Sequence, residues 1–400
     1  MKILQLCLRV PLPPHDGATI AIYNLAESLT NAGASVKMLS FNTKKHFIAD
    51  KNIPEIQKQK FDLETVFVDA SVKIFPALLN LFKKDESYNI IRFDVEDFHL
   101  RLSQVLQKET YDIIQFEGLF LSPYIETARK YSNAKLVLRA HNVEWLIWKR
   151  MANAAANPIK KKYLELLTQR LRSYEQRVLN KFDALVALTP DDENLLKQEG
   201  CTMPIYVAPV GLNTSSYPDA ILLQDASKID VFHLGSMDWM PNIEGVDWFL
   251  KKVWPLVIKK TNKVTLHLAG KKMDSAYFKL SNSHLNIEGE IVNSSAFMAD
   301  KQVMIVPLLS GGGMRVKIVE GLAAGKTIVS TTIGAEGIAY EHNKNLIIAD
   351  TPEEFCKAIV SLVGQTVTLN KISLEAQKLA RSVYDNKNIG QSVADFYNRI

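Results

Sequence analysis

Along most of the chain, short apolar runs rich in β-branched residues alternate with segments of helical periodicity. No other feature of the sequence restricts the possible folds as much as this alternation. It is typical of βαβ units, whose strands lie parallel in one sheet. The first strand is predicted at residues 2–8, and the helical pattern after it ends at Gly33. Residues 42–110 are less regular, and little can be placed there. Further strands are predicted at residues 113–116, 135–139, 184–187 and 205–208, besides one at 35–40.

A second series of the same kind begins after residue 220, with strands predicted at residues 231–234, 265–268, 303–306 and 328–330. The loop-like stretch 211–218 separates the two series. We therefore expect an α/β protein of two Rossmann-like, doubly wound domains that face each other across a cleft. The expected domains are residues 1–210 and 211–382, followed by a helix at 383–400 that packs back on the first domain. Ligands of such sheets bind outside the carboxyl ends of the strands.

The composition excludes several classes of protein. Of the 400 residues 47% are apolar and 23% charged, which is ordinary for a folded chain and wrong for a disordered one. The net charge of +5 is too small to indicate a nucleic-acid-binding protein. Cys7, Cys201 and Cys356 are too far apart to predict a metal site or a disulfide framework. Since no signal peptide and no apolar run of about 20 residues is found, we expect a cytoplasmic protein.

Residues 306–321 carry the most chemical information. A predicted strand leads into three glycines at 311–313, and a helix with Arg315 and Lys317 in its first turn follows. Glycines allow close approach to the backbone, and a helix N-terminus attracts anions. Lys317 and Glu320 share a helix face, so the segment favours a nucleoside diphosphate, with donors for the phosphates and a carboxylate for the ribose. The alternative is a glycine turn before an ordinary helix, with Lys317 and Glu320 as a solvated pair.

This segment resembles the donor motif of glycosyltransferase family 4, whose members are retaining enzymes of the GT-B fold. Further segments similar to the family are residues 207–213, 232–237, 325–331, 334–337 and 346–348, so the resemblance covers nearly the whole chain. It implies that a sugar passes from a nucleoside diphosphate-sugar on the second domain to an acceptor on the first. No other cofactor and no metal ion is expected.

The resemblance implies the donor-binding residues Gly235, Gly311, Gly312, Gly313, Met314 and Glu320. Glu320 corresponds to the second glutamate of the family's Glu-x7-Glu pair, which binds the donor ribose. The first glutamate of that pair falls on Gly312 and is absent, and the usual basic pair is replaced by Ser236 and Asn242. We therefore expect Arg315 and Lys317 to neutralise the phosphates, as in a subgroup with Gly-Gly-Gly-x-Arg-x-Lys.

Four residues of the first domain are further candidates. His141 follows a predicted strand, where a lone histidine is more often structural, but the resemblance implies that it reaches the transferring sugar. Asp16 and Gly17 form either a turn before a helix or the family's glycine loop near the acceptor. Glu117 comes directly after the strand at 113–116, and either lines the acceptor side or lies on a solvent-facing loop.

Residues 149–181 hold nine basic and two acidic side chains, a local charge of +7. Apolar residues recur there at helical spacing after Asn157 and Pro158, which predicts an amphipathic helix. We prefer a helix that faces the core and presents a solvated basic face. The alternative is a weak peripheral contact with anionic lipid at the inner face of the cell membrane, or with a phosphate-bearing acceptor.

Together these features predict a retaining glycosyltransferase of the hexosyltransferase type, acting on a saccharide or lipid-linked glycan in cell-surface polysaccharide synthesis. His141, Arg315 and Lys317 are the expected catalytic residues, and Asp16, Gly17 and Glu117 are expected on the acceptor side. Two alternatives remain: a sugar-nucleotide isomerase of the same fold, and a catalytically silent subunit that binds nucleotide-sugars. No nucleic-acid partner is expected.

Overall fold

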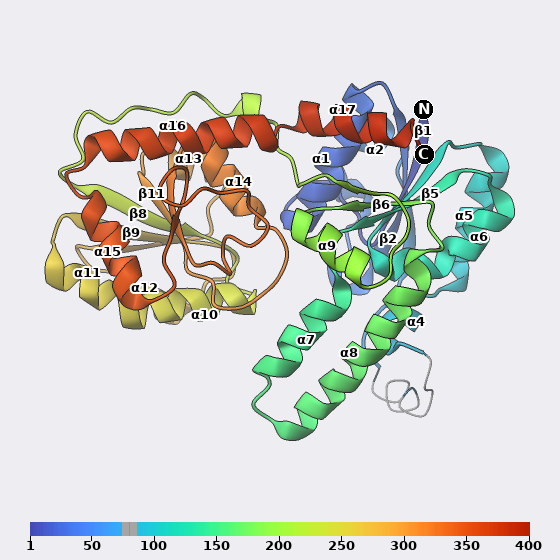
Figure 1. Cartoon of the computed structure of the whole chain (residues 1–400), viewed down its shortest axis with the longest axis horizontal. Helices are drawn as coiled ribbons and strands as arrows, with labels where there is room; N and C mark the ends of the chain where they lie inside the picture. Colours follow the sequence, from blue (N-terminus) through green and yellow to red (C-terminus); the bar gives the residue numbers. More distant parts are fainter. Residues whose placement is uncertain (74–79, 81–85) are drawn as a thin grey trace. The chain divides into compact units, whose positions relative to one another are not determined.

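A computed structural model describes residues 1–73, 80 and 86–400, and the chain forms two compact units (Figure 1). Unit 1 contains Met1–Val210 and Asn386–Ile400, and unit 2 contains Gly211–Asp385. Each unit is built on one parallel sheet with helices on its faces, so the α/β, Rossmann-like fold class predicted from the sequence is confirmed. The chain returns to unit 1 after Asp385, three residues beyond the expected boundary at 382.

The sheet of unit 1 has seven parallel strands in the order β3-β2-β1-β4-β5-β6-β7. Six of them were predicted from their apolar runs, whereas β3 falls in the irregular region where no element was placed. The strands are β1 (Lys2–Cys7), β2 (Ser35–Thr43), β3 (Glu64–Val68), β4 (Ile113–Glu117), β5 (Lys135–Ala140), β6 (Ala184–Ala187) and β7 (Ile205–Val207).

Helices cover both faces of this sheet because alternate strand residues point to opposite sides. The face that holds Ile3 and Ile113 packs against α1 and α17, whereas the face that holds Leu4 and Ile114 packs against α5, α6 and α8. The helices of unit 1 are α1 (Gly17–Asn31), α2 (Glu55–Lys60), α4 (Tyr88–Ile91), α5 (Glu96–Lys108), α6 (Ile125–Tyr131), α7 (Glu144–Ala154), α8 (Pro158–Leu179), α9 (Pro190–Gln198) and α17 (Asn386–Tyr397).

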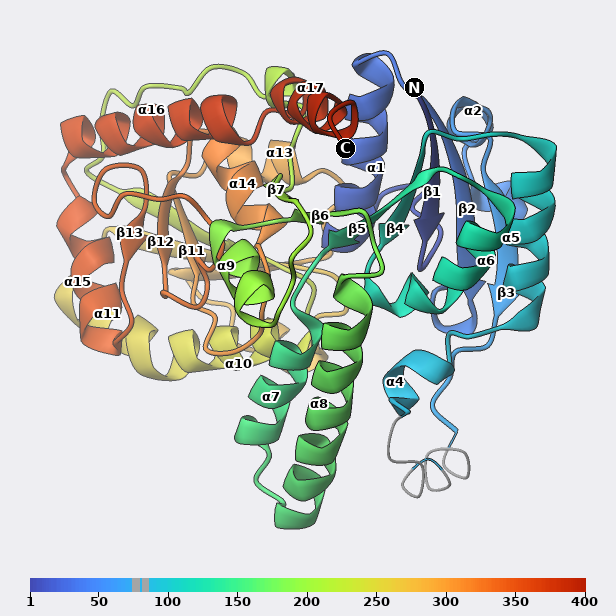
Figure 2. The ribbon, with the colours of Figure 1, turned by 45° about the vertical axis from the view of Figure 1, so that its right-hand side comes forward.

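Helices α7 and α8 form a long hairpin that extends away from the sheet of unit 1 (Figure 2). The predicted helix after Asn157 and Pro158 is present as α8, whose first backbone N–H groups are capped by the Asn157 side chain. Its apolar side, including Leu171 and Val178, packs into the core of unit 1, as expected for a helix that faces the core. The strongly basic segment is therefore part of the folded unit.

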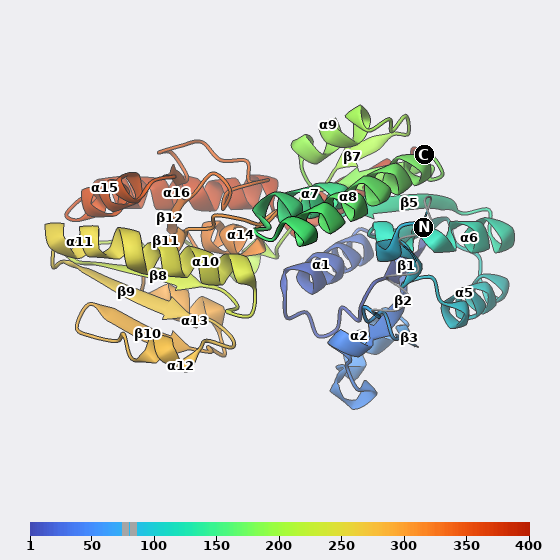
Figure 3. The same ribbon diagram turned by 90° about the horizontal axis from the view of Figure 1, so that it is seen from below.

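Unit 2 has six parallel strands in the order β10-β9-β8-β11-β12-β13, of which β10 and β13 were not predicted. Helices α10 and α11 run end to end along this sheet, joined by a π-helical turn at Phe249–Val253 (Figure 3). The strands are β8 (Ile229–Leu234), β9 (Val264–Ala269), β10 (Leu285–Gly289), β11 (Val303–Val306), β12 (Thr327–Ser330) and β13 (Ile347–Ile348). The helices are α10 (Met240–Trp248), α11 (Trp254–Lys260), α12 (Ser275–Phe278), α13 (Ser294–Ala299), α14 (Val316–Ala323), α15 (Pro352–Leu362) and α16 (Thr366–Val383).

Two further observations concern membrane spans and metal sites. Among the described residues, no helix has both the length and the apolar composition that a membrane crossing requires. In the same part of the chain, no three His, Cys, Asp or Glu side chains gather in a way that could hold a metal ion.

Candidate functional site

The glycine loop of unit 2 joins the carboxyl end of β11 to the N-terminus of α14. Gly311 and Gly313 have φ angles of +105° and +79°, a region that residues with a side chain rarely adopt. A Cβ atom on Gly311 would lie 2.9 Å from the Arg315 guanidinium and 3.3 Å from the Trp239 ring. The loop therefore needs glycine both for its backbone conformation and for the packing around it.

Arg315, the N-cap residue of α14, stabilises the conformation of this loop. Its guanidinium donates hydrogen bonds to the backbone oxygens of Gly312 and Gly313, the latter at 2.9 Å. The same group lies over the Trp239 ring, 5.2 Å from the ring centre, and Arg315 is only 6% exposed. Gly312 thus accepts a hydrogen bond through its backbone at the position where the family has a glutamate.

Lys317 is directed toward the first turn of α10. Its ammonium donates to the side-chain oxygen of Asn242 at 2.8 Å, and the Asn242 amide donates in turn to the backbone oxygen of Ser236. Burial lowers the pKa of Lys317 to about 7, and the nearby Arg315 contributes to the shift. The alternative of a solvated Lys317–Glu320 pair is wrong, because Lys317 is half-buried and its hydrogen-bond partner is Asn242.

Glu320 lies one helical turn further along α14. Burial raises the pKa of its carboxyl group to about 7, and Glu320 in turn contributes to raising the pKa of Tyr217. Within the described residues, no hydrogen-bond donor reaches the Glu320 carboxylate. An incompletely solvated carboxylate of this kind favours a ligand that donates hydrogen bonds, such as a sugar hydroxyl.

The donor residues predicted from the sequence are brought together in unit 2. Gly235 lies beside Asn242 so closely that a Cβ atom there would be 2.8 Å from the amide nitrogen. Met314 is half-buried between the glycines and α14. Sequence reasoning missed His233, a fully buried histidine in β8 whose Nδ1 lies 3.2 Å from the backbone oxygen of Ile305. A histidine within the otherwise apolar run of residues 231–234 was the available signal.

The candidate residues of unit 1 form a buried network at the carboxyl ends of β4 and β5. Glu117 is the last residue of β4 and only 1% exposed, so the alternative of a solvent-facing loop residue is wrong. His141 Nε2 lies 2.5 Å from the Glu117 carboxylate, and Arg139 donates to the same carboxylate oxygen at 3.2 Å. Burial alone would raise the pKa of Glu117, but Arg139 and His141 together lower it to about 2.

Three further side chains complete this network, and sequence reasoning identified none of them. Gln5 of β1 and Gln115 of β4 both donate to the other carboxylate oxygen of Glu117. The hydroxyl of Tyr397, on α17, donates to the Gln115 side-chain oxygen at 2.5 Å. The residues meet because Gln5 pairs with Gln115, and Glu117 with Arg139, in neighbouring strands, and side chains in register share one face of the sheet.

Asp16 and Gly17 begin helix α1. Asp16 is the N-cap, and its carboxylate accepts from the backbone N–H groups of Ala18 and Thr19 at 3.1 and 3.0 Å. Burial would raise the pKa of Asp16, but the adjacent Arg9 guanidinium at 2.7 Å and the Thr19 N–H hold it below its usual value. The turn before a helix is therefore present, and a role toward the acceptor stays a prediction.

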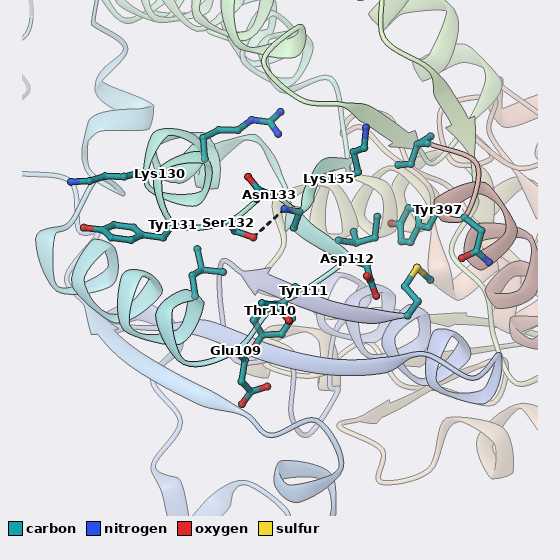
Figure 4. Close-up of a pocket in the computed structure, with 17 residues that line it drawn as sticks. Glu109, Thr110, Tyr111, Asp112, Lys130, Tyr131, Ser132, Asn133, Lys135 and Tyr397 are labelled. Atoms are coloured by element: carbon teal, nitrogen blue, oxygen red, sulfur yellow. Dashed lines mark hydrogen bonds between the residues drawn. The ribbon is translucent and has the colours of Figure 1, made fainter.

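A cavity of about 850 Å³ lies at the opposite edge of the same sheet, at the amino ends of β4 and β5 (Figure 4). Polar residues line it, among them Asp112, Ser132, Asn133 and Lys135. Because ligands of doubly wound sheets bind at the carboxyl ends of the strands, we do not assign the site to this cavity.

The nine basic residues of 149–181 do not form one uniform face. Arg172 pairs with Glu199, which follows α9, at 2.8 Å, and Lys181 pairs with Glu126 of α6 at 2.8 Å. Arg170 donates to the backbone oxygen of Asn80 at 2.7 Å. The tip of the α7–α8 hairpin keeps Lys149, Lys160 and Lys162 exposed, together with the apolar residues Met151 and Ile159. The exposed charge is thus divided between the tip and the C-terminal half of α8, where Arg172 and Arg177 are also exposed.

The fold and the sequence are both similar to known glycosyltransferases. Among solved structures, sucrose-phosphate synthase from Thermosynechococcus elongatus is similar to this chain, with a TM-score of 0.72 and 13% identity. The similarity covers 100% of this chain and 99% of that one. Anabaena Alr3699/HepE in complex with UDP has a TM-score of 0.67 and 15% identity over 100% of both chains. These likenesses show the GT-B fold.

A curated relative, an uncharacterized 44.6 kDa protein in the cps region of Klebsiella pneumoniae, is 23% identical over 403 residues and covers 98% of both chains. The family model described as "Glycosyl transferases group 1" matches residues 228–365. The model described as "Glycosyltransferase Family 4" matches residues 15–216, which is half of the chain. The chain therefore belongs to glycosyltransferase family 4 and is a glycosyltransferase of the GT-B fold.

Proposed function

We propose that this protein transfers a sugar from a nucleoside diphosphate-sugar to a hydroxyl group of a saccharide or lipid-linked glycan, with retention of the anomeric configuration. The observation that carries the proposal is the arrangement in unit 2, where a glycine loop at a helix N-terminus lies beside two poorly solvated charged groups, Lys317 and Glu320. The solved structures of Anabaena HepE with UDP and with UDP-glucose support a donor of this class. The relative from a cps region supports a role in cell-surface polysaccharide synthesis.

In this proposal, different residues of unit 2 bind different parts of the donor. The N–H groups of the glycine loop and the Lys317 ammonium bind the diphosphate, and Arg315 maintains the loop conformation through the Gly312 and Gly313 backbone. Glu320 accepts hydrogen bonds from the ribose hydroxyls. The donor thereby supplies the partners that Lys317 and Glu320 largely lack in the free protein.

Transfer breaks the bond between the anomeric carbon and the phosphate oxygen, and forms a bond to the acceptor oxygen on the same face of the sugar. The proton of the acceptor hydroxyl passes to the departing phosphate oxygen, so no protein base is required. Lys317 and the α14 N-terminus stabilise the negative charge that develops on the diphosphate. His141 orients a hydroxyl group of the transferring sugar.

A thermal-shift and calorimetric panel of UDP, UDP-glucose, other nucleotide-sugars and NAD⁺ tests this proposal, with mass spectrometry of the products. We expect stabilisation by UDP and by one class of UDP-sugar, and a glycosylated product or slow donor hydrolysis. Binding of NAD⁺ without any sugar nucleotide would overturn the proposal. An isomerised donor formed without acceptor would indicate the isomerase, and tight binding without turnover would indicate the silent subunit.

We also propose that the tip of the α7–α8 hairpin makes weak contact with anionic lipid, because exposed lysines flank the exposed Met151 and Ile159 there. Flotation with vesicles of phosphatidylglycerol should exceed flotation with phosphatidylcholine, and the difference should shrink in Lys160→Glu/Lys162→Glu. Equal flotation with both lipids would contradict the contact.

A further inference from the structure

A continuous chain of hydrogen bonds leads from the C-terminal helix α17 to His141. Tyr397 donates to Gln115, Gln115 donates to Glu117, and Glu117 accepts from His141 Nε2. The three buried residues of this chain are each 3% exposed or less, whereas the His141 side chain is 15% exposed. His141 is therefore the member through which the chain reaches solvent.

The Glu117 carboxylate at the centre of this chain is ionised and fixed in orientation. Arg139 holds its pKa low, and one carboxylate oxygen accepts from Gln5 and Gln115 while the other accepts from Arg139 and His141. A carboxylate that accepts from four donors cannot rotate without losing hydrogen bonds, so its orientation determines where each donor group lies.

This geometry determines which nitrogen of His141 is available to a ligand. Because Glu117 is ionised and accepts only, the proton on His141 Nε2 is held between the two groups. Within the described residues, Nδ1 has no hydrogen-bond partner. The ring orientation and the position of one proton are both set before any sugar binds.

We propose that Glu117 is a positioning residue for His141. Tyr397 of helix α17 contributes to the same positioning through its hydrogen bond to Gln115. This inference rests on the proposed function, in which His141 orients a hydroxyl group of the sugar. It changes the expected role of Glu117, whose carboxylate supports His141 from within the sheet. It also assigns a functional contact to a helix that follows unit 2 in the sequence.

The test is NMR of the full-length chain labelled with ¹⁵N-histidine, in which the His141 signals are identified by their loss in His141→Ala. In the wild type we expect an Nε2–H proton that is shifted downfield and protected from exchange with water. In Glu117→Gln this proton should move upfield and exchange about tenfold faster, because a charge-assisted hydrogen bond becomes a neutral one. Tyr397→Phe should produce a smaller change in the same direction, about two- to threefold.

Tyr384→Phe is the matched control, because Tyr384 is an equally buried tyrosine of unit 2 whose hydroxyl accepts from Ala339 outside this network. It should leave the His141 signals unchanged. An Nε2–H signal that is the same in the wild type, Glu117→Gln and Tyr397→Phe would overturn the inference. Tyr397→Phe keeps the test decisive if Glu117→Gln does not fold.

UDP release from UDP-glucose provides a second readout. We expect Glu117→Gln to lower kcat about tenfold with little change in the KM for UDP-glucose, and to have no further effect in a His141→Ala background. An equal loss in both backgrounds would show a merely structural role and contradict the inference. If the NMR changes appear but the wild type releases no UDP, the donor assignment fails while the positioning of His141 is supported.

Discussion

The candidate sites of the two units differ in how their charged groups are supported. In unit 1, Glu117 has four hydrogen-bond donors, and its pKa is lowered to about 2. In unit 2, Lys317 has the neutral Asn242 as its partner, and the pKa values of Lys317 and Glu320 both lie at about 7. An ion pair moves the pKa values of its two groups away from 7, whereas burial of a charged group without a charged partner moves its pKa toward 7. The site of unit 1 is thus complete without a ligand, whereas that of unit 2 is completed by one.

Arg139→Met should have the largest effect, and the effect is on the stability of unit 1. It leaves the Glu117 carboxylate buried without its charged partner, so we expect a loss of about 3–5 kcal/mol in the free energy of unfolding of unit 1. Chemical denaturation followed by circular dichroism measures the loss. Lys317→Met is the contrasting variant, because it removes a desolvated cation and should leave the stability unchanged or higher. A similar loss in both variants would contradict the difference between the units.

Lys317→Met should instead reduce the affinity for UDP about 10- to 100-fold, which corresponds to the loss of one charge-assisted hydrogen bond of about 1.5–3 kcal/mol. Isothermal titration calorimetry measures the change. In the wild type the affinity should fall as the pH rises above 7, because Lys317 loses its proton there and binding must restore it. The variant should lack this fall, and an identical pH profile in both proteins would remove Lys317 from the phosphate site.

Glu175→Gln tests a place where unit 1 departs from the pattern of well-paired charges. The carboxyl groups of Glu144 and Glu175 are buried near each other, and burial raises their pKa values to about 7 and 8. A raised pKa stabilises the fold at low pH, and this stability is lost as the pH rises from about 4.5 to 8. Glu175→Gln should therefore be close to the wild type in stability at pH 5 and exceed it by more than about 2 kcal/mol at pH 8.

Thermal unfolding across this pH range measures the effect, and Glu165→Gln, an exposed position on the same helix α8, is the control. A stability difference that does not grow with pH would show that Glu175 is ionised in the folded protein at neutral pH.

Gly311→Ala should have the smallest effect, about 1–2 kcal/mol of stability, because alanine is strained at a φ of +105°. Gly312→Ala is the matched control on the same loop, since the φ of Gly312 is outside the left-handed region. The melting temperature of unit 2 should fall only in Gly311→Ala. Equal shifts in both variants would show that the loop conformation is not what requires glycine.

The fold could be predicted from the sequence wherever a strand is buried on both faces. The run at Ala184–Ala187 is an example, because each of its residues is buried and apolar. The three missed strands, β3, β10 and β13, lie at sheet edges, where one side of the strand has no neighbour. Residues such as Thr65 and Glu288 are exposed there, and the apolar pattern is correspondingly weak. Pairing with the neighbouring strand selects these conformations, and pairing is not a local property of the sequence.

The residues of the candidate sites could likewise be predicted only in part. The loop at 311–313 with Lys317 and Glu320 could be predicted because these residues are adjacent in the sequence. The partners of Glu117 could not, because Tyr397 and Gln115 are 282 residues apart and meet only through the packing of α17 on the sheet. The role of Asn242 as the partner of Lys317 likewise depends on the first turns of α10 and α14, which are 75 residues apart in the sequence and meet only in the fold.

The return of the chain to unit 1 through α17 also has a consequence for synthesis on the ribosome. The core of unit 1 includes Ile389, Val393, Phe396 and Tyr397, all of which are translated after the whole of Gly211–Asp385. While unit 2 emerges and folds, this face of the sheet of unit 1 is therefore covered by α1 but not yet by α17. During that interval the nascent chain exposes the apolar surface that α17 later covers, so this surface is the part of the molecule on which a chaperone would act.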